Sequence, residues 1–352
     1  MGPMLVSLSS LFAACNLRAA EVSIGMMRWD AWAYDAAAGS AYQQAKYSIS
    51  KTKWNTLGYW PWWATVDGRG CLIEMNEDTQ AIMDQENQYA YDSQISYWSF
   101  LKYPEASPLN HAFKKYLSSS KKNLVKFAFI ISSAQNSTAE FNAAIAYMTT
   151  DPQYFALNGR VLIFIYPYDM APTGYVISHL RASVRGTGKP NPYIVLYNMD
   201  GFGEDARSEY SPGIWSGSHG RSFSALINLA SGQWSSSTSR NYVPNGPVGW
   251  DSRPYAERPP KWYPHPDDCW YVPATKDEYR QMLQKAVDYV IGNPAKCPAL
   301  TITTKEWNGF TEGANGAPSL AKGTIYMDAI KSVNRFGSHV SVGERSSGAV
   351  AN

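Results

Sequence analysis

Two glutamates, Glu306 and Glu312, lie six residues apart in the segment TITTKEWNGFTEG, which begins at Thr301. Charged residues make up only 17% of the chain, so two acids beside Trp307 call for a chemical reason. Hydrolysis of a glycosidic bond needs one protonated acid and one ionised carboxylate, roughly 5 Å apart for retention and 6.5–9.5 Å apart for inversion. We therefore take Glu312 and Glu306 as candidate catalytic residues.

Three further acids follow predicted strands and are alternatives for the second carboxylate. Asp30 ends the first apolar run, Asp200 the fifth and Asp251 the seventh. Each also has a purely structural explanation. Asp30 can pair with Arg28, and Asp251 can pair with Arg253. Asp200 starts a Gly-rich turn, where Asp is common.

Aromatic residues are unusually frequent, with 13 Trp and 24 Tyr. Flat rings with a polar tip bind the faces of sugars, although a large core also uses such rings. The long segment 33–74 contains YWPWW at 59–63, and long ordered loops are usually functional. We expect these rings at the mouth of a cleft. The candidate substrate-binding residues are Trp29, Trp60, Trp62, Trp63, Trp250, Trp307, Asp30, Asp200 and Asn308, whose amide suits a sugar hydroxyl.

Eight apolar segments predict the strands that must position these residues. They cover residues 22–32, 95–103, 124–132, 160–168, 193–200, 223–229, 243–251 and 299–307. Near-continuous apolar runs suit parallel strands that are covered on both faces. Helical patterns separate many of them, including one that starts at a capping box, Thr275 to Glu278. The sequence predicts an α/β fold, a (β/α)8 TIM barrel over residues 21–336 with its site at the carboxyl ends of the strands. Residues 201–242 read mostly as loop.

The two ends of the chain differ in composition from the predicted barrel. Residues 1–20 predict a secretory signal, and FAAC, which ends at Cys15, resembles a bacterial lipoprotein box. We therefore expect a secreted, periplasmic or cell-surface protein, with a lipid anchor at Cys15 as an alternative. We find no other segment that is long and apolar enough to cross a membrane. Residues 337–352 are small and polar and predict a flexible tail.

Composition excludes several classes of function. A formal net charge of +2 provides no basic field for nucleic acid. The five His are scattered and no Cys-x-x-Cys is present, so we expect neither a metal nor a cofactor. Cys269 and Cys297 flank one predicted helix and are a candidate disulfide. We expect a monomer that acts on a polysaccharide or oligosaccharide.

Three motifs in the last third of the chain resemble a known group. The segment WNGFTEG at 307–313 resembles the Trp-Asn-Glu-aromatic-x-Glu-Gly motif of WbsX-like proteins and glycoside hydrolase family 99, with family 71 more distant. The segment VGWDSRP at 248–254 resembles a Gly-Trp-Asp segment near strand seven of the WbsX-like group. The segment GTIYMDA at 323–329 resembles a helix of that group. The order of predicted elements agrees over most of residues 21–336.

This resemblance implies a (β/α)8 glycoside hydrolase that acts within α-linked glycans. Glu312 matches the second motif Glu and inherits its role as general acid/base. Gly309 stands where the first motif Glu is expected, and glycine cannot act as a base. Either Glu306, three residues earlier, or Asp251 or Asp200 from across the barrel replaces that carboxylate.

Two other functions remain open at this point. Loss of the motif carboxylate at Gly309 also fits an inactive barrel that only binds carbohydrate. A polysaccharide lyase, which uses a Lys, Tyr or His base against a uronic acid, is the third alternative. Lys305, Lys102, Arg28 and Arg253 near strand ends are compatible with such an anionic glycan.

Overall fold

The computed structural model describes residues 21–50, 59–134, 138–167, 170–212, 217, 219–264 and 266–336. The predicted leader at 1–20, with Cys15, and the predicted tail at 337–352 lie outside the described residues. Among the helices of the described part, none is both long enough and apolar enough to cross a membrane.

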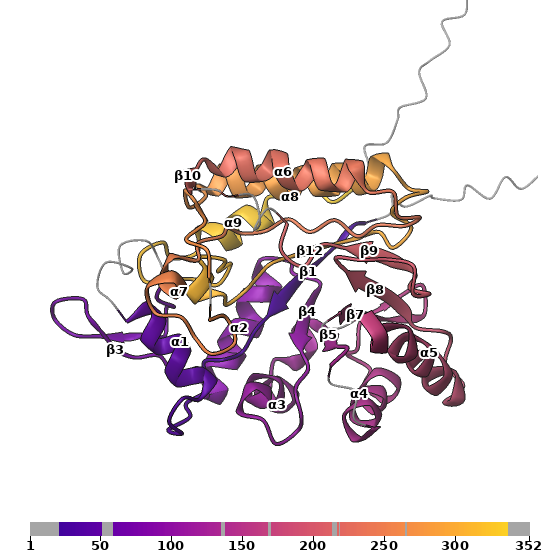
Figure 1. Cartoon of the computed structure of the whole chain (residues 1–352), viewed down its shortest axis with the longest axis horizontal. Helices are drawn as coiled ribbons and strands as arrows, with labels where there is room; N and C mark the ends of the chain where they lie inside the picture. The colour runs from indigo at the N-terminus through magenta and orange to yellow at the C-terminus, as the bar shows by residue number, and fades with distance from the viewer. Residues whose placement is uncertain are drawn as a thin grey trace, which may run out of the picture.

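A curled sheet with seven parallel strands organises the chain (Figure 1). In spatial order these are β12 (Thr301–Thr304), β1 (Ser23–Arg28), β4 (Tyr97–Leu101), β5 (Lys126–Ser132), β7 (Arg160–Tyr166), β8 (Tyr193–Tyr197) and β9 (Ala206–Ser208). A short strand, β6 (Ala156–Leu157), pairs antiparallel with β7. The carboxyl ends of the seven strands therefore gather at one edge of the sheet, which is where the sequence places its candidate site.

Both faces of this sheet are buried, which explains the continuous apolar runs. Side chains alternate across a strand, so neighbours such as Met26 and Met27 enter two different apolar clusters. Tyr97 lies in the cluster of Met27, and Trp98 lies in that of Met26. The ring of Tyr97 occupies the space beside Gly25, where a Cβ atom would lie 2.1 Å from the Tyr97 ring. Glycine at this position lets an aromatic residue fill the face.

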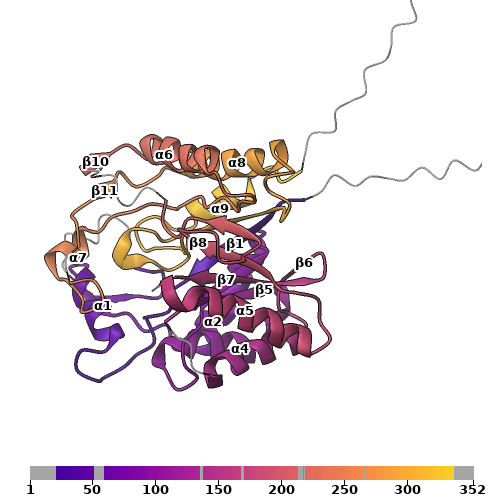
Figure 2. The ribbon, with the colours of Figure 1, turned by 45° about the vertical axis from the view of Figure 1, so that its right-hand side comes forward.

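Helices cover one face of the sheet, because the apolar cluster of Met26 contains helix residues whereas that of Met27 contains none. The longer helices are α1 (Ala41–Ile49), α2 (Gln80–Asp92), α3 (His111–Ser118), α4 (Thr138–Thr150), α5 (Met170–Gly186), α6 (Phe223–Ser236) and α8 (Lys276–Gly292), and the shorter ones are α7 (Arg253–Glu257) and α9 (Ile325–Lys331). Helices α6 and α8 lie side by side in both views (Figures 1 and 2). The predicted capping box is confirmed, because Thr275 and Glu278 cap α8 reciprocally.

Two short strand pairs, one antiparallel and one parallel, lie outside the main sheet. Strands β2 (Thr65–Val66) and β3 (Leu72–Glu74) form a hairpin within the long segment after β1. Strands β10 (His219–Arg221) and β11 (Trp270–Tyr271) pair in parallel. Short 3-10 turns occur at Pro108–Asn110 (η2), Lys122–Leu124 (η3) and Phe310–Glu312 (η4). The last of these carries the second glutamate of the candidate pair.

The predicted sixth strand at 223–229 is wrong. Those residues begin α6, with Ser222 as its N-cap and Phe223, Leu226, Ile227 and Ala230 buried at helical spacing. The sixth strand is instead β9, only three residues long, in the region that reads as loop. Three residues carry too little alternation to be recognised, whereas the helical spacing was present in the sequence.

The full eight-stranded barrel that we predict is not formed by regular strands. Residues 241–248 take the place of a seventh strand between β9 and β12. The N–H of Val243 donates to the carbonyl of Arg207 at 2.9 Å, and the N–H of Gly246 donates to that of Thr303 at 2.9 Å. Pro244 and Pro247 lack an N–H donor, so the segment makes only isolated parallel bridges.

Candidate active site

A cavity of about 410 Å³ opens at the carboxyl ends of β7, β8, β9 and β12. Its lining consists of Tyr166, Asn198, Glu209, Tyr210, Ser211, Gln233, Trp250, Trp262, Tyr263, Lys305 and Glu312. Tyr166 ends β7, whereas Lys305 directly follows β12. Five of the eleven lining residues are aromatic, so Glu312 lies in a ring-lined hollow.

Lys305 joins the two glutamates of the sequence motif. Its Nζ lies 2.5 Å from Glu312 Oε2 and 3.7 Å from Glu306 Oε1, and its side chain is 4% exposed. Those two oxygen atoms are therefore no more than about 6.2 Å apart, the sum of the two distances, so one ammonium joins both carboxyl groups. The strand end thus holds a carboxylate, an ammonium and a second carboxyl group in contact.

The carboxyl group of Glu306 lies where a side chain on residue 309 would begin. A Cβ atom on Gly309 would lie 2.1 Å from Glu306 Oε1. Glu306 is buried, and its Oε2 has no hydrogen-bond partner among the described residues. Burial, together with the charges of Glu312 and Asp30 and against the opposing effect of Lys305, raises the pKa of Glu306 to about 8. Glu306 is not among the residues that line the cavity.

The same two carboxylates act on the lysine. Burial acts to lower the pKa of Lys305, but the charges of Glu306 and Glu312 outweigh it, so the pKa lies above its usual value. The Lys305 ammonium also lies 5.1 Å from the ring centre of Tyr210 and 5.2 Å from that of Trp250. The cation is therefore held by carboxylates and by rings of the cavity wall.

Backbone contacts fix the loop that carries Glu312. The carbonyl of Glu312 accepts a hydrogen bond from the N–H of Asp251 at 2.6 Å. The Asn245 amide donates to the carbonyls of Glu209 and Tyr210 at 2.8 and 3.0 Å, and its Oδ1 accepts from the N–H of Lys305 at 3.1 Å. Asn245 thereby ties the end of β9 to the end of β12.

Asp251 forms part of a separate buried cluster. Its carboxylate accepts hydrogen bonds from Arg253 Nε at 2.9 Å and Nη2 at 2.5 Å and from the hydroxyl of Tyr59. It lines a small pocket with Lys322 and not the cavity that contains Glu312. The pairing with Arg253 that the sequence allowed is therefore present.

Asp30 is also occupied by neighbouring side chains. Its Oδ1 accepts from Arg28 Nη2 at 2.9 Å and from Asn308 Nδ2 at 2.8 Å. Arg28 is fully buried and pairs in addition with Glu77 and Glu86. Burial and the charge of Glu86 raise the pKa of Glu77 well above its usual value. This network joins β1 to α2 and to the loop that follows β12.

The side chain of Asn308 forms its hydrogen bonds within the protein interior and does not line the cavity. It is fully buried, and its Oδ1 accepts from the backbone N–H of Trp29 at 3.0 Å. Its carbonyl accepts from Trp32 Nε1 at 2.9 Å. Asp200 is exposed and accepts a hydrogen bond from the hydroxyl of Ser239. Neither residue is placed where the cavity could present it to a sugar.

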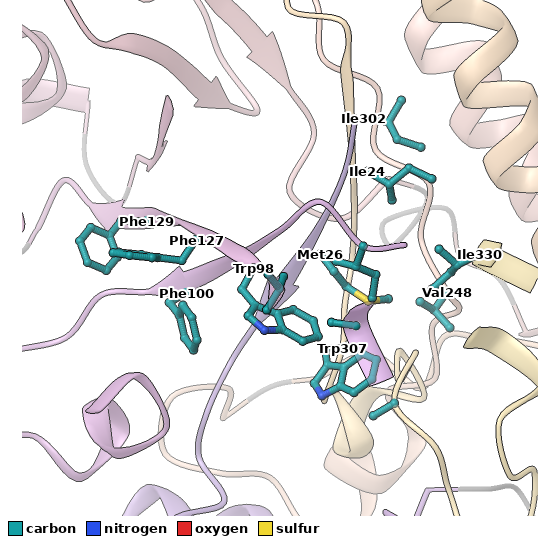
Figure 3. Close-up of a cluster of buried hydrophobic side chains, with 14 of the residues drawn as sticks. Ile24, Met26, Trp98, Phe100, Phe127, Phe129, Val248, Ile302, Trp307 and Ile330 are labelled. Carbon is teal, nitrogen blue, oxygen red and sulfur yellow. The ribbon is translucent and has the colours of Figure 1, made fainter. Parts of the chain in front are cut away.

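The candidate tryptophans divide into three groups. Trp250 lines the cavity, and Trp29 meets the cavity-lining Trp262 edge to face at 5.4 Å. Trp60 and Trp307 are fully buried in the core; Figure 3 shows Trp307 beside Trp98 and Met26. Trp62 and Trp63 are half-buried and pack edge-on against Tyr89 and Phe310 respectively. The expectation that YWPWW forms the mouth of a cleft is wrong for Trp60.

The candidate cations are all occupied by acids. Lys102 Nζ lies 2.6 Å from Glu105 and donates to the carbonyl of Tyr103 at 2.8 Å. Arg28, Arg253 and Lys305 have the carboxylate partners described above. These cations therefore pair with carboxylates of the protein itself, and not with a site that is open to an anionic glycan.

Several cavity residues were missed by the sequence reasoning. Glu209 follows β9, and its Oε1 accepts from Arg207 Nη2 at 2.6 Å. Gln233 lies on α6, and both fall in the region that reads as loop. Trp262 is 42% exposed at the cavity wall, and Tyr263 follows it. Glu209 was missed because the strand that it follows was not expected. Trp262 and Tyr263 could have been found, because two adjacent aromatic residues are candidates for a sugar-binding surface.

The described part of the chain contains neither a cluster of metal ligands nor a disulfide. No group of three or more His, Cys, Asp or Glu side chains within it is arranged to hold a metal ion. Cys269 and Cys297 are free thiols, so the candidate disulfide is not formed. Burial raises the pKa of Cys297 to about 12, which leaves this thiol uncharged.

Comparison with known proteins identifies a shared fold. No family model matches the chain, and no curated protein does. A solved GH99 endo-alpha-mannosidase from Bacteroides thetaiotaomicron, in complex with BIS-TRIS-propane, is similar with a TM-score of 0.56 and 14% identity, over 87% of this chain and 94% of that one. A second structure of the GH99 endo-alpha-mannosidase gives a TM-score of 0.55 and 13% identity, over 87% and 95%. The fold is therefore GH99-like.

Proposed function

We propose that this protein is a glycoside hydrolase that cleaves within a polysaccharide or other glycan. The observation that carries the proposal is the position of Glu312, which lies in an aromatic-lined cavity and is joined through Lys305 to the Glu306 carboxyl group, because glycosidases act through a pair of carboxyl groups. The GH99-like fold and the endo-alpha-mannosidase activity named for its structural neighbours support the same reaction class.

Glu312 is the residue that contacts substrate in this proposal. It lines the cavity, so in its protonated form it can donate a proton to the leaving oxygen, and the carboxylate that results can later withdraw a proton from the attacking group. Lys305 holds its Oε2 and sets its orientation. Rings of Tyr210, Trp250 and Trp262 provide apolar faces on either side for the sugar.

Glu306 is the second carboxylate in preference to Asp251. The Glu306 oxygen lies where the side chain of residue 309 would begin, which supports Glu306 as the substitute for the motif carboxylate. Asp251, by contrast, is engaged by Arg253 and Tyr59 and lines another pocket. We assign Glu306 the role of assisting attack at the sugar. Because it does not line the cavity, its contact with the site is through the Lys305 ammonium.

The fold proposed for this activity is a (β/α)8 barrel in which residues 241–248 act as the seventh strand. Their hydrogen bonds to both β9 and β12 support this assignment. We also propose that the protein is exported, on the basis of the apolar segment within residues 1–20.

Substitution of Glu312 by Gln tests the proposed function. Purified protein is incubated with α-glucans, mannans and uronic or sulfated polysaccharides, and released oligosaccharides are separated by chromatography. Loss of the general acid/base is expected to lower the hydrolysis rate by about 10²- to 10⁴-fold. Asp277→Asn, which removes an equal charge from a side chain that is 90% exposed, is the matched control. Full activity of Glu312→Gln, with both variants folded by circular dichroism, would refute the assignment.

A non-catalytic carbohydrate-binding barrel is the second candidate. It is favoured by one observation, the absence of Glu306 from the cavity lining. This alternative predicts that the wild-type protein binds a glycan from the same panel without releasing any product, and that Glu312→Gln weakens binding only modestly.

A further inference from the structure

Three buried polar atoms of the cavity wall lack a hydrogen-bond partner. They are Ser211 Oγ, Gln233 Oε1 and Trp250 Nε1, and no described residue satisfies any of them. Buried polar groups are nearly always paired, because an unpaired one loses its hydrogen bonds to water without replacement. Three such atoms on residues that line one cavity therefore leave hydrogen-bonding capacity for a polar ligand there.

The three atoms differ in hydrogen-bonding character. The Trp250 indole is a donor only, the Gln233 amide oxygen is an acceptor only, and the Ser211 hydroxyl is both. Glu209 adds an acceptor, because its contacts with Arg207 involve Oε1. Each sugar hydroxyl donates one hydrogen bond and accepts others, so a ring with several hydroxyls matches this set better than a phosphate or an ammonium does.

Rigid elements hold these groups in place before a ligand arrives. Gln233 lies near the end of α6, next to Trp234, which is fully buried. Trp250 is 6% exposed. Tyr210, adjacent to Ser211, donates its backbone N–H to Asn198 Oδ1 at 2.9 Å. Preorganised donors and acceptors lose little conformational entropy when a ligand binds.

We infer that Ser211, Gln233 and Trp250, with Glu209, form a wall that recognises hydroxyl groups of the glycan beside the cleavage site. The inference rests on the proposed function and extends it by naming residues that select the substrate without taking part in proton transfer. Substrate hydroxyls replace the missing partners, while the neighbouring rings contact the apolar face of the same sugar.

Kinetics of three single variants test this inference. The oligosaccharide hydrolysed fastest in a panel of α-linked gluco- and manno-oligosaccharides is used to compare Gln233→Ala, Ser211→Ala and Trp250→Phe with the wild type. Loss of one hydrogen bond to a neutral group is expected to raise KM about threefold to tenfold in each, with kcat within about twofold. Calorimetric titration of the same sugar into each variant combined with Glu312→Gln gives the affinity without turnover.

Gln281→Ala is the matched control, because Gln281 is exposed on α8 and outside the cavity. Unchanged KM and affinity in all three wall variants, with hydrolysis intact, would overturn the inference and leave the proposed function standing. Binding that the wall variants weaken, without any hydrolysis by the wild type, would support the inference and overturn the hydrolase. A wild type that neither binds nor hydrolyses any sugar of the panel would overturn both.

Discussion

Gly309 and Glu306 share one space: a Cβ atom on Gly309 would lie 2.1 Å from Glu306 Oε1 and 2.9 Å from the carbonyl oxygen of Ala314. Real side chains do not approach so closely, so a residue larger than glycine at 309 and the observed Glu306 carboxyl group exclude each other. The glycine at 309 thus leaves room for the carboxyl group of the residue three positions earlier. This relationship makes Glu306 the better candidate for the second carboxylate.

Gly309→Ala is expected to destabilise the protein and to reduce activity. The new methyl group displaces the Glu306 carboxyl group, and overpacking of this kind costs about 1–3 kcal/mol. Urea unfolding measures the free energy of unfolding, and product release measures the activity.

The double variant Gly309→Ala with Glu306→Ala separates this clash from general strain. Without the Glu306 carboxyl group, the methyl group of Gly309→Ala approaches only the Ala314 carbonyl. Gly309→Ala should therefore destabilise the Glu306→Ala variant less than it destabilises the wild type. Equal costs of Gly309→Ala in the presence and absence of Glu306 would show that the two side chains do not compete for one space.

Glu306→Gln is expected to alter how stability depends on pH. The pKa of Glu306 rises from an ordinary value of 4.5 to about 8 in the folded protein, mainly through burial. Between these values the folded state binds a proton that the unfolded state does not, so its stabilisation is complete below about pH 4.5 and is lost as pH rises through about 8. The variant should lose this decline between about pH 4.5 and 8.

The same titration should appear in the activity. If Glu306 assists attack as a carboxylate, kcat/KM of the wild type rises toward pH 8, because the ionised fraction increases over that range. Rate measurements across pH 5–9 in the wild type and Glu306→Gln check this, with the exposed Asp277→Asn as a control. A wild-type profile without a rising limb in that range would argue against this role.

Lys305→Met is expected to destabilise the fold strongly. The lysine is the cation between Glu306 and Glu312, and removal of one partner of a buried charged group typically costs about 3–5 kcal/mol. The loss should grow above pH 8, where Glu306 is ionised and pairs with the lysine as a charge. Thermal unfolding at pH 7 and pH 9 measures the effect, and a cost that does not depend on pH would mean that the Glu306 ion pair is not its source.

Asp251→Asn distinguishes the two candidates for the second carboxylate. Because Asp251 pairs with the partly exposed Arg253 and lines a separate pocket, its loss should lower the free energy of unfolding by about 2–4 kcal/mol. At a temperature where the variant is folded, kcat should stay within about threefold of the wild type. A fall in kcat similar to that of Glu312→Gln would instead assign Asp251 to the chemistry.

The local pattern of the sequence determined most elements of this fold. Largely apolar or β-branched runs located six of the seven parallel strands, because a strand buried on both faces carries few polar side chains. The capping box placed the start of α8 at Thr275 for a similarly local reason. Glu306 and Glu312 stood out for their position after the last strand, which needs no knowledge of distant contacts.

Tertiary structure alone decided which of these side chains meet. Trp60 and Trp307 belong to the core while Trp262 faces a cavity, since a tryptophan suits either environment and only packing between distant segments selects one. Glu209 reaches the cavity because a three-residue strand, too short to show a pattern, inserts beside β8. The crowding of Gly309 by Glu306 likewise arises from the path of the turn after β12, which brings together atoms whose contact no spacing in the sequence reveals.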